Sequence, residues 1–254
     1  MKKVKILQIN AWTGRIKQGL TNFIVNGDFD VICMQEAIWD ENHTEALEIF
    51  IDTVDKIKKS ANFEYDYRSP IYGFKMLGGD VEFTQGNVIL SKIPIVDTEE
   101  KTLCGEYKVA ENAKDFDPIF WGHRCVVQKA KLKNGFTVFN YHGYWEQNPL
   151  GSATSTKYMR RVAEMIKKES GPVALCGDLN VVYEAPAMRE LDFLQDLTAV
   201  KNIKNTLNGV KFKDDVACDH ILINDDILAD RFEVADEFLS DHKALTAELY
   251  PKTI

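Results

Sequence analysis

The chain has 254 residues, of which 45% are hydrophobic, and its formal net charge is −8 at pH 7. This length can bury a large core, and no stretch rich in Pro, Gly or Ser marks a linker, so we expect one domain over residues 1–254. The acidic balance disfavours non-specific binding to nucleic acid, although a local cleft can still be basic. Because no apolar run has the length of a signal peptide core or a membrane span, we expect a cytoplasmic protein without a membrane segment. We also expect a monomer.

The first third of the chain has the pattern of a βαβ unit. Residues 4–10 predict a strand, residues 15–26 a helix with one apolar face, and residues 29–36 a second apolar strand. Apolar residues then recur at helical spacing from Ala46 to Ile57 and predict a longer helix.

The middle third predicts antiparallel strands. Strand-like runs occupy residues 63–69, 86–91, 123–132 and 136–142. The dipeptide Asn134-Gly135 between the last two favours a two-residue hairpin turn.

The last third alternates helices and strands again. The pattern predicts a helix from about Thr154 to Glu169, ended by Gly171 and Pro172, and a shorter helix around residues 185–195. Strands are predicted at residues 173–180, 219–224, 231–236 and 243–249. Helices interleaved with strands around an antiparallel centre indicate an α/β (α+β) fold of mixed sheets covered by helices.

Five cysteines are scattered along the chain without a CxxC pair, and most of them lie in apolar, strand-like runs. This usage favours buried, reduced thiols over disulfides or a zinc site. The five are Cys33, Cys104, Cys125, Cys176 and Cys218.

Polar residues stand where several predicted strands begin or end. Strand ends along one edge of a sheet are the usual place for a site in α/β folds. Residues two apart in a strand share a face, so Asp178 with Asn180, and Asn140 with His142, could each serve one cleft. The candidate set at strand ends is Asn10, Glu36, His142, Asp178, Asn180, Asp219, Asp241 and His242.

These residue types suit phosphoester hydrolysis. Carboxylate and amide oxygens bind a hard cation such as Mg²⁺, imidazoles can contact phosphoryl oxygens, and an acid can orient a water molecule. The set contains no Ser or Cys, which favours direct attack by water over a covalent intermediate.

Seven short strings along the chain, read in order, resemble the endonuclease/exonuclease/phosphatase family, which includes nucleases, inositol polyphosphate phosphatases and sphingomyelinases. The family resemblance implies a four-layer sandwich of two mixed β-sheets flanked by helices. The strings are "LQIN", "ICMQE", "GNVILSKIPI", "FNYH", "CGDLN", "CDHILI" and "SDHKAL", which lie between residue 7 and about residue 245.

The resemblance also implies a role for each candidate. Glu36 resembles the principal metal-binding carboxylate of the family, with Asn10 and Asp241 near the metal, which is Mg²⁺ or Mn²⁺. Asp178 resembles the residue that orients or deprotonates the attacking water. The remaining implied contacts are Asn180 with the nucleophile or phosphate, His142 with the scissile phosphate, and His242 as the second imidazole, paired with Asp219.

Several of these residues have simpler alternatives. Asp178 could form an Asx turn or cap a helix, and Asn10 could be a turn residue. Asp219 could be a buried acid at a turn, and Arg124 is a candidate for either a phosphate contact or a structural one. His43, His123 and His220 are interpreted as surface or structural residues.

Substrate identity should depend on two loops, at residues 69–85 and 143–152. Tyr144 and Trp145 in the second loop could stack on a planar substrate group or pack beneath the loop. We therefore hypothesise a metal-dependent enzyme that hydrolyses a phosphodiester or phosphomonoester. The alternatives are a nuclease acting on DNA or RNA, which the net charge disfavours, and a catalytically inactive binding module on the same scaffold.

The string "SDHKAL" carries a geometric prediction. In an extended strand Asp241 and His242 would point to opposite faces and could not share a site. If both serve the cleft, the chain must bend between Ser240 and His242, and the last strand can begin only near Lys243.

Overall fold

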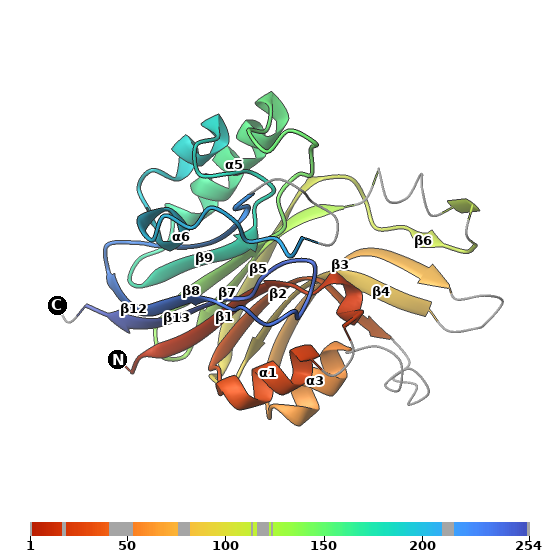
Figure 1. Ribbon diagram of the computed structural model, residues 1–254, viewed down its shortest axis with the longest axis horizontal. Coiled ribbons are helices and arrows are strands. Elements are labelled where there is room, and N and C mark those ends of the chain that lie inside the picture. Colours follow the sequence, from red (N-terminus) through yellow and green to blue (C-terminus); the bar gives the residue numbers. More distant parts are fainter. Residues whose placement is uncertain are drawn as a thin grey trace.

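Two β-sheets pack face to face, and helices cover their outer faces, in the computed structural model (Figure 1). The structure describes residues 2–16, 19–40, 53–75, 82–112, 114–115, 122, 124–209 and 216–252. Both sheets are mixed, because β1 runs parallel to β2 and β8 parallel to β9 while most other neighbours are antiparallel.

The first sheet has seven strands among the described residues. Their order is β12 (Ile227–Val234), β13 (Leu245–Pro251), β1 (Val4–Asn10), β2 (Val31–Asp40), β4 (Glu82–Ser91), β3 (Tyr65–Lys75) and β6 (Val109–Ala110).

The second sheet has six strands in the same part of the chain. Their order is β10 (Gln195–Asp196), β11 (Asp219–Ile223), β9 (Val173–Asp178), β8 (Thr137–Tyr141), β7 (Cys125–Leu132) and β5 (Ile95–Cys104).

Each sheet buries its outer face under helices. Helices α1 (Gly19–Gly27) and α3 (Val54–Ser60) pack on the first sheet, and α5 (Ala153–Ile166) with the 3-10 helix η2 (Pro186–Leu191) packs on the second (Figure 1). Two short elements remain, the 3-10 helix η1 (Trp12–Gly14) and α6 (Leu197–Val200). The expected four-layer sandwich is thus confirmed.

The layer between the sheets changes from apolar to polar along the strands. At one end, Val4 and Ile6 of β1 face Val138 and Ala174 of the second sheet in a fully buried apolar cluster. Further along the same face, β1 continues with Gln8 and Asn10, because alternate residues of a strand share a face. One end of the sandwich is therefore a hydrophobic core, and the other is built from polar side chains.

A buried amide network joins the two sheets at the polar end. Gln8 and Gln35 exchange two hydrogen bonds, of 2.8 and 2.9 Å, and Gln35 Nε2 donates to Asn140 Oδ1 at 2.6 Å. Asn140 Nδ2 donates in turn to Gln128 Oε1 at 2.9 Å. Buried amides are costly unless hydrogen-bonded, so this network favours one alignment of the sheets below the polar end. Asn140 serves this network, one layer beneath His142 on the same face.

The structure differs from the predicted elements in a few places. The hairpin connection between Leu132 and Phe136 has three residues instead of two, with Gly135 at φ 92°. The predicted helix around residues 185–195 is the 3-10 helix η2, and β5 was not predicted. Residues 46–52 of the predicted long helix, as well as His43 and His123, lie outside the described residues.

All five cysteines are free, and four of them are buried, as expected. No helix in the described part of the chain is both long enough and apolar enough to cross a membrane.

Candidate active site

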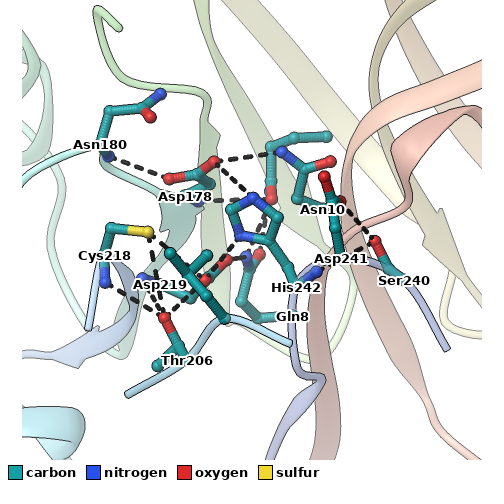
Figure 2. Close-up of polar contacts among 12 residues, drawn as sticks. Gln8, Asn10, Asp178, Asn180, Thr206, Cys218, Asp219, Ser240, Asp241 and His242 are labelled. Carbon is teal, nitrogen blue, oxygen red and sulfur yellow. Dashed lines mark hydrogen bonds and ion pairs between the residues drawn. The ribbon is translucent and has the colours of Figure 1, made fainter. Parts of the chain in front are cut away.

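A cavity of about 490 Å³ lies at the polar end of the sandwich. Six of the eight strand-end candidates line it, namely Glu36, His142, Asp178, Asn180, Asp241 and His242. Asn10 and Asp219 lie directly behind them and reach Asp178 and His242, respectively, by hydrogen bonds (Figure 2). All eight strand-end candidates therefore belong to one site.

Glu36 reaches the cavity through a β-bulge. Two residues of β2, Gln35 and Glu36, face a single residue of β4 between the pairs Met34–Val88 and Ala37–Gly86. Glu36 has a φ of 47°, a left-handed conformation that is costly for a residue with a side chain. Bulges commonly re-aim side chains next to active sites, and here the bulge leaves Gln35 in the buried network while Glu36 lines the cavity.

Two glycines bring the ends of β8 and β9 together. A Cβ at Gly177 would lie 2.0 Å from the Tyr141 carbonyl oxygen, and a Cβ at Gly143 would lie 2.0 Å from the carbonyl oxygen of Leu179. Gly143 N–H also donates to the Asp178 carbonyl at 2.7 Å. This close approach, open only to glycine, places His142 beside Asp178.

Asp178 uses its two carboxylate oxygens differently. Oδ1 accepts from the Asn180 N–H at 3.0 Å, which is the Asx turn considered as the simpler alternative. Oδ2 accepts from Asn10 Nδ2 at 3.1 Å and lies 3.5 Å from His142 Nε2 and 3.7 Å from His242 Nε2. One oxygen therefore forms the turn of the simpler alternative, while the other faces the two imidazoles at the cavity.

The electrostatic setting keeps Asp178 ionised. Burial alone would raise the pKa of this carboxyl, but the neighbouring His242 and His142, with the Asn10 amide, lower it below its ordinary value. A carboxylate in this state accepts hydrogen bonds on both oxygens, and it can accept a proton from water.

His242 is held from behind by Asp219. His242 Nδ1 donates to Asp219 Oδ2 at 2.9 Å, and the same carboxylate accepts from Thr206 Oγ1 at 2.7 Å and from Gln8 Nε2 at 3.2 Å (Figure 2). Burial disfavours the charged ring, yet Asp219 and Asp178 raise the pKa of His242 well above its ordinary value. The imidazolium therefore presents Nε2–H toward Asp178 and the cavity.

The corner before the last strand has the predicted form. The chain bends over residues 239–241, and β13 begins only at Leu245. Ser240 Oγ donates to Asp241 Oδ1 at 3.2 Å and accepts from the His242 N–H at 3.3 Å. The bend allows Asp241 and His242, neighbours in sequence, to line the same cavity.

The three predicted substrate-contact residues fall in different places. Trp145 lines the cavity and is 44% exposed. Tyr144 instead packs edge-on against Tyr158 of α5, with ring centroids 5.6 Å apart. Arg124 is absent from the described cavity lining.

The Arg124 guanidinium is held by other partners. It donates to Thr102 Oγ1 at 2.9 Å, to the Pro70 carbonyl at 3.1 Å and to the Glu100 carboxylate. These contacts match the structural alternative for Arg124.

Two groups of side chains offer metal ligands. Glu36 and Asp241 bring carboxylates to the cavity, and Asn10 joins them through a hydrogen bond from its Nδ2 to Glu36 Oε1 at 3.2 Å. The Asn10 amide oxygen accepts from the Trp12 N–H at 3.1 Å. An oxygen-only set is the one that Mg²⁺ or Mn²⁺ prefers, so these residues fit a hard divalent cation.

The second group is Asp178, Cys218 and His242, whose ligand atoms all lie within 4.8 Å of one another. A thiol binds metal as a thiolate, but burial and the nearby Asp178 raise the pKa of Cys218 well above its ordinary value. Asp178 and His242 already face each other across 3.7 Å, and His242 Nδ1 is bound to Asp219. This group therefore suits a metal less well than the Glu36 group does.

Sequence reasoning missed several residues of the site. Gln8 shares the inward face of β1 with Asn10, so strand parity could have indicated it. Thr206 and Cys218 touch Asp219 from loops without a periodic signal. Glu146 lines the cavity, and its Oε2 is buried without a hydrogen-bond partner among the described residues.

Comparison with known proteins gives a family and a fold. A sequence model described as the Endonuclease/Exonuclease/phosphatase family matches residues 7–242. Comparison with the sequences of curated proteins finds no match.

Three solved structures illustrate the structural likeness. The endonuclease/exonuclease/phosphatase from Beutenbergia cavernae DSM 12333 has a TM-score of 0.69 and 15% identity, over 99% of this chain and 72% of that one. The mannosyl-6-phosphatase of Bacteroides thetaiotaomicron VPI-5482 has a TM-score of 0.65 and 14% identity, over 97% and 99%. Sphingomyelinase C of Streptomyces griseocarneus has a TM-score of 0.58 and 16% identity, over 98% and 99%. At these identities the likeness shows a shared fold.

Proposed function

The chain belongs to the endonuclease/exonuclease/phosphatase family and has its phosphoesterase scaffold, and we propose that it hydrolyses a phosphodiester with activated water, using Mg²⁺ or Mn²⁺ as cofactor. One observation carries the proposal. An ionised Asp178 lies within 3.5 and 3.7 Å of two imidazoles in a cavity that also holds the carboxylates of Glu36 and Asp241.

The charge of each side chain sets its role in the proposed reaction. Asp178 accepts a hydrogen bond from a water molecule and takes up its proton as the water attacks phosphorus. Protonated His242 donates from Nε2 to a phosphoryl oxygen, because Asp219 fixes Nδ1 as the other donor. His142 approaches the same oxygens from the end of β8, and Asn180 closes the turn that holds the Asp178 carboxylate.

A bound divalent cation would supply positive charge against the phosphoryl oxygens, with Glu36 and Asp241 as its carboxylate ligands and Asn10 as the predicted third ligand. Within the protein itself, the bulge at Glu36 and the corner at Ser240 fix the two carboxylates in place before substrate binds.

The cavity wall favours a diester over a monoester. Trp12, Ile71, Tyr72 and Trp145 line it beside the phosphate-binding groups. A phosphomonoester has one organic substituent on phosphorus, and its other oxygens are unsubstituted. A diester has a second organic substituent, which an apolar wall can contact. The mannosyl-6-phosphatase and the sphingomyelinase C act on different esters by their names, so the substrate of this chain must be argued from its own cavity wall.

The wall gives little support to a nuclease. Arg15 is the only lysine or arginine among the described residues that line the cavity, whereas the acidic residues there are Glu36, Glu146, Asp178 and Asp241. Tight binding to a polyanion takes several phosphate contacts from basic side chains. An inactive binding module is also disfavoured, since all eight strand-end candidates are present and assembled.

A cation-dependent assay tests the proposal. Metal-free protein should hydrolyse bis-p-nitrophenyl phosphate only after Mg²⁺ or Mn²⁺ is added, and faster than the monoester p-nitrophenyl phosphate. Glu36→Gln should need more cation for half-maximal rate and lose about 10- to 100-fold in activity. The exposed Glu184→Gln, outside the described cavity lining, is the matched control and should behave as wild type. Equal activity in wild type and Glu36→Gln would contradict the assignment.

A further inference from the structure

Two cysteines face each other across a strand pair behind the active site. Cys104 at the end of β5 is the residue opposite Cys125 at the start of β7, next to a bulge between Thr102 and Cys104. Both side chains pack on the core beneath α5, close enough for each thiol to shift the pKa of the other. Cross-strand Cβ atoms lie about 4.5–5.5 Å apart. A disulfide needs about 3.5–4.5 Å, so a small movement at the bulged end of β5 would close one.

The two thiols differ in reactivity. Cys104 is half-buried, and the neighbouring Cys125 thiol and Tyr158 hydroxyl lower the pKa of its thiol to about 6 against the effect of burial. Cys125 is only 5% exposed, and the pKa of its thiol is raised well above the ordinary value by the neighbouring Cys104 and by burial. Cys104 thus carries the thiolate, which is the nucleophilic form, and Cys125 keeps the proton.

A second thiol pair provides a contrast within the same molecule. Cys33 of β2 and Cys176 of β9 lie in one apolar cluster between the two sheets, and both are fully buried. Burial raises the pKa of the Cys33 thiol well above its ordinary value. An oxidant has no access to this pair, and burial disfavours the Cys33 thiolate.

We propose that Cys104 and Cys125 form an oxidation site, at which hydrogen peroxide closes a disulfide that disturbs His142. The Cys104 thiolate attacks one peroxide oxygen, the O–O bond breaks, and hydroxide leaves, so Cys104 becomes a sulfenic acid. The Cys125 sulfur then attacks the Cys104 sulfur, and the S–O bond breaks with release of water. Both sulfurs are oxidised and the peroxide oxygens are reduced, and the hydroxide combines with the one proton that Cys104 lost on ionising to give a second water.

The disulfide reaches the active site through one contact. The Cys125 thiol donates to the His142 carbonyl at 3.6 Å, and its sulfur lies 3.8 Å from Tyr141 Oη. Oxidation removes this donor and pulls Cys125 toward β5. His142 Nε2 lies 3.5 Å from Asp178 Oδ2. A shift of the His142 backbone therefore displaces this imidazole from Asp178, and the oxidised protein turns over more slowly. This last step rests on the proposed function, whereas formation of the disulfide does not.

Thiol titration with peptide mapping tests the oxidation site without any activity assay. Peroxide treatment should lower the number of thiols that titrate in denaturant from five to three, and mapping should join the Cys104 and Cys125 peptides. Cys104→Ser should keep all its remaining thiols, and Cys176→Ala, the matched control at the buried pair, should still form the bond. Retention of all five thiols in wild type, or a bond to Cys33, Cys176 or Cys218, would overturn the proposal.

Activity of the mapped protein tests the effect on His142. Turnover should fall several-fold on oxidation, recover with dithiothreitol and be insensitive to peroxide in Cys104→Ser. Because that variant retains Cys218 in the cavity, peroxide inhibition of Cys104→Ser would assign the effect to Cys218 and overturn this part. Turnover that is equal in the reduced and the fully disulfide-bonded protein would overturn it as well. A reduced wild type without activity would count against the proposed function alone.

Discussion

Two Asp–His pairs lie on opposite faces of β11, and only one of them faces the cavity. Asp219 points between the sheets and holds His242 Nδ1 at 2.9 Å. His220, the next residue, points to the other face and binds Asp196 Oδ2 through Nδ1 at 2.7 Å. The pairs differ at the second ring nitrogen. His220 Nε2 is bound to the Val181 carbonyl at 3.0 Å, whereas His242 Nε2 faces Asp178 across 3.7 Å at the cavity.

The difference between the two pairs shows what distinguishes a structural imidazole from one that can take part in catalysis. His220 is fully buried with both nitrogens hydrogen-bonded, so it connects β11 to the segments around it and has nothing left for a ligand. His242 has one nitrogen fixed by an acid and the other directed toward the place where a substrate would bind. An Asp–His pair alone therefore does not mark an active site, but an open nitrogen in a cavity does.

Asp178→Asn should have the largest effect, because it removes the group that the open nitrogens face. An amide cannot accept the proton of the attacking water, and we expect kcat to fall by about 10²- to 10⁴-fold. The amide can still accept from the Asn180 N–H, so the turn should survive. Steady-state kinetics measures this, with the exposed Asp192→Asn as control. Wild-type turnover in Asp178→Asn would show that Asp178 is not the general base.

His220→Leu should affect stability and leave the chemistry alone. The change leaves the buried Asp196 Oδ2 without its charged partner, and breaking a buried ion pair in this way costs about 3–5 kcal/mol of the free energy of unfolding. Turnover per folded molecule should stay within a few-fold of wild type. Urea denaturation and kinetics measure the two quantities. If Leu prevents folding, His220→Asn, which keeps a donor for Asp196, provides the test. A large loss of turnover in a folded variant would erase the contrast between the pairs.

The smallest effect is a pH dependence of stability from the same pair. Burial opposes the charged ring, but Asp196 raises the pKa of His220 above its ordinary value of 6.5. A raised folded-state pKa means that the contribution is fully present below the unfolded pKa and is lost as pH rises through the folded pKa.

Wild type should therefore lose stability relative to His220→Leu as the pH rises above about 6.5. Urea denaturation over a pH series measures the difference. Parallel curves for the two proteins would show that His220 does not titrate with folding.

Much of the site could be predicted because it follows the apolar-to-polar switch at strand ends. Asn10, Asp178 and Asp219 each stand where a buried strand begins or ends, and strand parity places them on the inner face. The corner at Ser240 followed from requiring Asp241 and His242 to share a cavity. These inferences need only local pattern and the geometry of a strand.

The rest depends on contacts between segments distant in sequence. Glu36 was predicted to end its strand, but β2 continues to Asp40, and the bulge that gives Glu36 its positive φ is apparent only when β2 is paired with β4. Strand β5 has mostly exposed side chains and no clear apolar pattern, so it was missed. Two of the three partners of Arg124, Thr102 and Glu100, lie on that strand, and without it Arg124 could not be separated from the phosphate-binding candidates.

Turnover of His242→Gln beside His220→Leu, in one assay with bis-p-nitrophenyl phosphate and saturating Mg²⁺ or Mn²⁺, tests the central claim most directly. Loss of a positioned donor to the phosphoryl oxygens should lower kcat of His242→Gln by about 10²- to 10³-fold. His220→Leu should remain within a few-fold of wild type. Wild-type turnover in His242→Gln, or equal losses in the two variants, would contradict the assignment of this cavity as a phosphoesterase active site.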